Sequence, residues 1–129
     1  MPEFSAKSKM RLKECDTRLQ DVANAAIHRI DFTILCGHRG KEDQEDAFER
    51  GTTRLHYPKS KHNKFPSMAF DAAPYPINWD DIDRFKAMAT IILDEARKLH
   101  IPIRWGGDFN RNGLPDDKFK DLPHFEIDE

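Results

Sequence analysis

The chain has 129 residues, of which 34% are charged and 38% hydrophobic, and its formal net charge is −2 at pH 7. A chain of this length is typical of one domain with a single hydrophobic core, so we expect residues 1–129 to form one domain. The slight negative charge disfavours a nucleic-acid-binding protein. No segment approaches the roughly 20 apolar residues that a membrane-spanning helix needs, so we expect no membrane insertion.

The first half of the chain alternates helical patterns with a segment rich in strand-forming residues. Apolar residues recur every three or four positions from about residue 8 to residue 30, which predicts one long amphipathic helix. The segment Asp31–Cys36 predicts a strand, and the turn GHRG follows it. A short charged helix is predicted over Lys41–Arg50, and Gly51 is well placed to end it.

The middle of the chain predicts a loop, a buried strand and a second long helix. Residues 52–66 have the composition of a loop, and Met68–Ala73 are apolar enough for a buried strand. A strong amphipathic pattern covers Asp81–Leu99, and Asp80 is a suitable residue to cap the start of this helix. We expect the two tryptophans of the chain to pack in the core rather than to contact a substrate.

The C-terminal part predicts two more strands separated by a polar segment. The strands are IPIRWGG and HFEI, and the polar turn between them is DFNRNGLPDDKFKD. Alternation along HFEI places His124 and Glu126 on one face of the sheet. The whole pattern predicts an α+β fold, with helices packed on a small, mainly antiparallel sheet.

The N-terminal residues and the cysteines indicate the cellular compartment. The segment MPEFSAKSKMRLKECD has no apolar core of the kind that secretory signals carry, so we expect synthesis in the cytoplasm without a signal peptide. Cys15 and Cys36 do not form a CxxC pair and define no disulfide framework. We expect both to be small buried residues, with a disulfide or metal role as the alternative.

Six short motifs occur in a fixed order along the chain. Single histidines and aspartates are usually surface residues, so each motif alone decides little. In order, the motifs are GHR, SKH, AFDAAPY, NW, RWGGDF and DLPHFE. This ordered set resembles the zinc peptidases that cut peptidoglycan peptides, which comprise VanY-like D-Ala-D-Ala carboxypeptidases and the L-alanyl-D-glutamate endopeptidases of phage endolysins. The resemblance covers nearly the whole chain and implies a Hedgehog/D,D-peptidase-like fold.

The resemblance also implies a metal centre and two catalytic residues. One Zn²⁺ per chain would be held by His62, Asp71 and His124, which leaves the fourth coordination position that catalytic zinc sites keep open. The catalytic carboxylate of the family corresponds to Asp121, and its substrate-polarising arginine corresponds to Arg39.

Two further residues and one loop leave alternatives open. Glu126 could orient His124 through a hydrogen bond or be a solvated glutamate at a strand end. Ser60 could bind substrate or cap its loop. His62 and Asp71 lie nine positions apart (71 − 62), two more than in the common form of the family. The longer loop leaves the substrate preference open without changing the predicted ligands.

Within this family, a small form without a signal peptide resembles phage lysis enzymes. The resemblance implies cleavage of the L-Ala–D-Glu bond of the peptidoglycan stem peptide during host lysis. We expect a monomer without a separate cell-wall-binding module, which a holin releases from the host cytoplasm to the periplasm and cell wall. One alternative is a D-Ala-D-Ala carboxypeptidase with the same zinc chemistry. The other is a catalytically silent, zinc-stabilised binding module, which has no need of Asp121 or Arg39.

Overall fold

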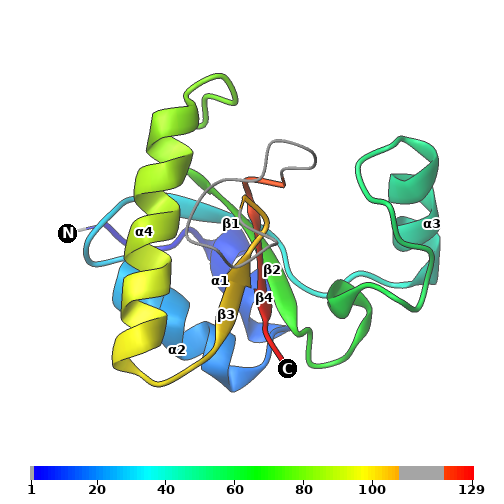
Figure 1. Cartoon of the computed structure of the whole chain (residues 1–129), viewed down its shortest axis with the longest axis horizontal. Coiled ribbons are helices and arrows are strands. Elements are labelled where there is room, and N and C mark those ends of the chain that lie inside the picture. The colour runs from blue at the N-terminus through cyan, green and yellow to red at the C-terminus, as the bar shows by residue number, and fades with distance from the viewer. Residues whose placement is uncertain (1, 108–120) are drawn as a thin grey trace.

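The computed structural model describes residues 2–107 and 121–129, and it confirms the predicted α+β fold (Figure 1). The helices are α1 (Ala6–Lys13), α2 (Thr17–Ala26), α3 (Lys41–Glu49) and α4 (Ile82–Lys98), with the short 3-10 helix η1 (Lys61–Asn63). The strands are β1 (Phe32–Cys36), β2 (Ala69–Pro74), β3 (Ile103–Trp105) and β4 (His124–Ile127). They form an antiparallel sheet in the order β1-β2-β4-β3. The predicted polar turn over residues 108–121 lies, except for its last residue, outside the described residues.

The two central strands of the sheet bring distant parts of the chain together. Strand β2 pairs with β4 so that Asp71 is opposite His124. On its other side β2 pairs with β1, where an irregularity in the pairing near Cys36 also brings that residue opposite Asp71. Cys36, Asp71 and His124 therefore meet at one place in the sheet although they come from three strands.

The core lies between the sheet and three of the helices. Helices α1, α2 and α4 contact the sheet or one another, whereas α3 stands apart from them at the right of Figure 1. The face that α4 buries consists of Phe85, Met88, Ala89, Ile92 and Ala96. Ile82 and Leu99, which the periodic pattern also assigns to this face, are exposed at the two ends of the helix. None of the helices in the described part of the chain is long and apolar enough to cross a membrane.

The prediction of one long helix over residues 8–30 is wrong, because the segment forms α1 and α2 with a break between them. The break is a tertiary pairing: the backbone N–H of Asp16 donates to the Ser67 carbonyl at 2.9 Å, and that of Ser67 donates to the Glu14 carbonyl at 2.8 Å. The Asp16 side chain then caps α2 by accepting from the Arg18 N–H at 2.9 Å. The buried residues of α1 and α2 keep a spacing of three or four positions across Cys15, so the apolar period does not reveal the break between the helices.

Three smaller predictions concern caps and burial. Gly51, with a φ of 78°, follows the end of α3 as predicted, because glycine adopts this left-handed conformation without strain. The cap of α4 is Asp81 and not Asp80, since the Asp81 side chain accepts from the Arg84 N–H at 3.3 Å. Both cysteines are free, and while Cys15 is buried, Cys36 is only partly so.

Candidate metal centre

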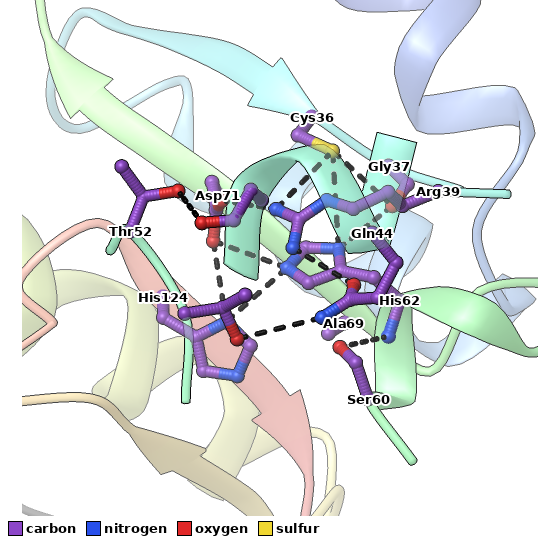
Figure 2. Close-up of polar contacts among 12 residues, drawn as sticks. Cys36, Gly37, Arg39, Gln44, Thr52, Ser60, His62, Ala69, Asp71 and His124 are labelled. Carbon is purple, nitrogen blue, oxygen red and sulfur yellow. Dashed lines mark hydrogen bonds and ion pairs between the residues drawn. The ribbon is translucent and has the colours of Figure 1, made fainter. Parts of the chain in front are cut away.

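The three predicted ligands converge on one point, although they come from three elements (Figure 2). His62 lies in η1, Asp71 in the middle of β2 and His124 at the start of β4. The Nε2 atom of His62, the Oδ1 atom of Asp71 and the Nδ1 atom of His124 are each 3.2 Å from the other two. Tetrahedral zinc with bonds of 2.0–2.1 Å requires ligand atoms about 3.3 Å apart. The three donors therefore fit a zinc ion.

A carbonyl group fixes which nitrogen of His62 faces the centre. The Nδ1 atom of His62 is 2.7 Å from the Gly37 carbonyl oxygen, which can only accept, so Nδ1 carries the proton and Nε2 is left as a ligand. Gly37 is required here because a Cβ atom at this position would lie 2.3 Å from the Arg11 carbonyl oxygen. The glycine of the GHR motif thus allows the close backbone packing behind His62.

The ring of His124 is held by a carboxylate. Its Nε2 atom is 2.7 Å from Oε1 of Glu126, which leaves Nδ1 to face Asp71. Oε2 of Glu126 lies 3.3 Å from Lys61 Nζ and 3.3 Å from Arg104 NH2. Burial raises the pKa of Glu126, but the hydrogen bond from His124 and these two cations hold it down at about 2. Glu126 is therefore ionised and lies where the orienting role requires, on the predicted face of β4.

His62 and Asp71 form an ion pair within the centre. Burial lowers the pKa of His62, but the charge of Asp71 outweighs it and raises the pKa to about 10. Burial acts in the opposite direction on Asp71, whose pKa the two histidines hold well below its usual range. A metal ion would replace the proton of His62 as the partner of this carboxylate.

Arg39 reaches the edge of the centre. Its NH2 atom lies 3.5 Å from Oδ2 of Asp71, and its backbone N–H donates to the His62 carbonyl at 2.8 Å. Its NH1 atom donates to the Gln44 side chain at 3.0 Å. The GHR turn therefore brings a permanent positive charge beside the three predicted ligands.

Gln44 is a site residue that the sequence analysis missed. It is fully buried, and its Oε1 atom accepts from Arg39 NH1 and, at 3.1 Å, from Asn63 Nδ2. Its Nε2 atom donates to the Leu55 carbonyl at 2.7 Å. One signal in the sequence could have identified it. Gln44 is an uncharged residue in a charged helix, and it lies three positions before Ala47, so both residues share the face of the helix that points inward.

Asp121 lies beside the ligands and lines the same cleft. Burial raises its pKa to about 6, and the negative charge of Asp71 adds to this effect, although the two histidines and Arg39 oppose it. Its backbone is fixed by Gly106, because Asp121 N–H donates to the Gly106 carbonyl at 3.0 Å. A Cβ atom on Gly106 would lie 2.1 Å from the Asp121 carbonyl oxygen, which explains the first glycine of RWGG.

The cleft over the centre has a volume of about 640 Å³. One wall is formed by the segment after α3, from Thr52 to Lys61, and Trp79 lines the cleft as well. Ser60 is buried and caps η1 by accepting from the His62 N–H at 3.2 Å, which favours the capping alternative for this residue. The longer loop between His62 and Asp71 exposes residues 64–66, which are not among the ligands.

Comparisons with known proteins agree with this fold and these motifs. In structure, the chain is similar to the L-Ala D-Glu endopeptidase ChiX of Serratia marcescens, with a TM-score of 0.79 and 23% identity over 98% of this chain and 90% of the other. In sequence, it is 33% identical to the L-alanyl-D-glutamate peptidase of Escherichia phage T5 over 124 residues, which are 92% of this chain and 89% of the relative. Residues 2–127 match the phage L-alanyl-D-glutamate peptidase family, and the chain belongs to this family. The family predicted from the ordered motifs is therefore confirmed.

Proposed function

We propose that this chain is a zinc-dependent peptidoglycan hydrolase that cleaves the L-Ala–D-Glu bond of the stem peptide. The observation that carries the proposal is the group of three donor atoms spaced for tetrahedral zinc, with Asp121 and Arg39 beside it in one cleft. The choice of bond is supported by the family, since both relatives carry the names of peptidases specific for this linkage.

Each residue of the site has a separate role in hydrolysis. His62, Asp71 and His124 would hold Zn²⁺, which when bound supplies a Lewis acid that lowers the pKa of a coordinated water. Asp121 takes the proton of the attacking water and delivers it to the leaving amine, and a pKa near neutrality suits a group that does both. Arg39 stabilises the negative charge that develops on the carbonyl oxygen, because it stays charged and lies at the edge of the centre.

The biological setting of this reaction belongs to the proposal as well. A phage relative suggests a role in host lysis, in which the enzyme passes from the host cytoplasm to the cell wall after a holin acts. One protomer carries all five proposed site residues, so a monomer is sufficient for the reaction. The partner of the protein is then the stem peptide of peptidoglycan.

The product analysis of digested peptidoglycan tests the bond. An L-alanyl-D-glutamate endopeptidase leaves muramic acid that still carries L-Ala and releases peptides with a new free amine on D-Glu, which mass spectrometry identifies. A carboxypeptidase instead releases free D-Ala and leaves the turbidity of the cell-wall suspension nearly unchanged, because it cuts no structural connection. A silent binding module releases nothing, and either of these two results would refute the proposed activity.

A further inference from the structure

Trp79 is exposed at the cleft, contrary to the expectation that both tryptophans belong to the core. Trp105 is buried, but Trp79 is 56% exposed and lines the cleft together with Asp121 and His124. Its ring stacks on Phe85, with the centroids 5.5 Å apart and the planes at 23°. Phe85 belongs to the core, so this contact fixes the indole from one side. Ligand sites are lined largely by hydrophobic and aromatic side chains, so an exposed ring that is fixed at a cleft is suited to contact a ligand.

The two sides of the cleft differ in charge. The segment after α3 contributes Arg54 and Lys59, which are both exposed cations that line the cleft. The loop that precedes α4 contributes the exposed indole of Trp79 to the cleft. Figure 1 shows the loop that precedes α4 and the segment that follows α3 on opposite sides of the strands that carry the ligands. The cleft therefore has exposed cations on one side and an exposed aromatic ring on the other.

The substrate of the proposed function has the same asymmetry. On one side of the L-Ala–D-Glu bond, L-Ala is joined through a lactyl group to the muramyl sugar. On the other side, D-Glu and the residues after it carry carboxylates. A sugar ring presents C–H groups that can pack on an aromatic face, and carboxylates favour arginine and lysine. Only one orientation of the peptide places both parts of the substrate on matching sides of the cleft.

We infer that Trp79 forms the binding site for the muramyl sugar, and that the carboxylates on the D-Glu side lie toward Arg54 and Lys59. This inference rests on the proposed function and adds the direction in which the substrate lies. The Trp79 site is one residue beyond the cleaved bond, so it contributes to binding of the intact glycopeptide. It contributes nothing to a peptide from which the sugar has been removed.

The test compares two substrates with the zinc-loaded protein: N-acetylmuramyl tetrapeptide and the same tetrapeptide without its sugar. Trp79→Ala should raise KM for the muramyl peptide by at least about fivefold, a typical contribution of one aromatic contact. It should leave kcat/KM for the free peptide unchanged. Trp79→Leu should change the two kinetic constants in the same way as Trp79→Ala. Because leucine still covers Phe85, this variant separates loss of the sugar contact from loss of stability. Tyr75→Ala is the matched control, because Tyr75 is 58% exposed and does not line the cleft.

A second variant tests the direction of the substrate. Lys59→Gln should raise KM for both substrates by a similar factor, because both keep the carboxylates. Equal losses on the two substrates for both Trp79 variants, or an unchanged KM for the muramyl peptide, would overturn the inference. If the wild-type protein hydrolyses neither substrate, the proposed function fails. Calorimetric binding of the same two compounds to the same variants then decides whether Trp79 holds the sugar.

Discussion

Replacing Gln44 by alanine should damage both the stability of the protein and the position of Arg39. Gln44 has no exposed surface, and its side chain makes hydrogen bonds of 2.7 Å to Leu55, 3.0 Å to Arg39 and 3.1 Å to Asn63. Alanine removes these three bonds and a longer one of 3.4 Å to Thr53 Oγ1, and it leaves a buried space among polar groups. One buried unsatisfied group lowers stability by about 1–3 kcal/mol, and water entering the space offsets part of the loss. We therefore expect the free energy of unfolding to fall by about 2–3 kcal/mol.

Urea unfolding of the zinc-loaded protein, followed by circular dichroism, measures this change. Gln20→Ala is the matched control, because the Gln20 side chain donates a single hydrogen bond, 2.9 Å long, to the Cys15 carbonyl. Gln20→Ala should lower the free energy of unfolding by about 0.5–1.5 kcal/mol. Only the change at Gln44 should lower kcat, by about 10- to 100-fold, since misplacement of a catalytic group by 1 Å can have an effect of this order. Zinc content should stay at one per chain in both variants.

Two results would refute this reasoning. If Gln44→Ala unfolds at the same urea concentration as Gln20→Ala, the hydrogen bonds of Gln44 carry no special weight. If stability falls but kcat stays at the wild-type value, Gln44 supports the fold and does not position Arg39. Equal losses of zinc and of activity would place the effect at the metal centre instead.

The other predictions concern the metal centre and its neighbours. A chelator should abolish activity and Zn²⁺ should restore it, while His62→Ala should lose the metal in elemental analysis; full zinc content in that variant would exclude His62 as a ligand. Asp121→Asn should keep zinc and lower kcat by about 10²- to 10⁴-fold, whereas a near-normal rate would assign the base elsewhere. Wild-type kcat/KM should fall as the pH drops below about 6, because only the ionised form of Asp121 accepts a proton and its pKa is about 6; an activity constant down to pH 4 would contradict this role. Glu126→Ala should weaken zinc binding by about 10- to 100-fold in competition with a chelator, and an unchanged affinity would remove its orienting role.

The sequence analysis identified the candidate ligands, but it did not identify the surroundings that position them. His62, Asp71 and His124 could be named because the ordered motifs carry them, and strand alternation placed Glu126 beside His124. What alternation could not provide is the register of β2 against β4, which depends on pairing between segments about fifty residues apart. The register determines that Asp71 lies opposite His124.

The failures share a physical cause, since each depends on a specific contact that no periodic pattern reveals. The break between α1 and α2 comes from backbone pairing with Ser67, which an apolar period cannot reveal. Gln44 occurs in a helix rich in charge, and its importance is visible only once Arg39 and Leu55 are seen to surround it. Trp79 was assigned to the core from residue type alone, but it is 56% exposed while its ring stacks on Phe85.

The structure also holds the candidate ligands and Arg39 through different contacts. The ligands are held from the sheet side, where Glu126 fixes His124 and the Gly37 carbonyl fixes His62. Arg39 is held from the opposite side by Gln44 of α3, which makes no hydrogen bond to any of the three ligands among the described residues. A change at Glu126 should therefore act first on zinc affinity, and a change at Gln44 first on turnover. The segment that follows α3 forms the basic wall of the cleft. We therefore expect sequence variation in this part of the chain to alter substrate binding without changing the affinity for the metal.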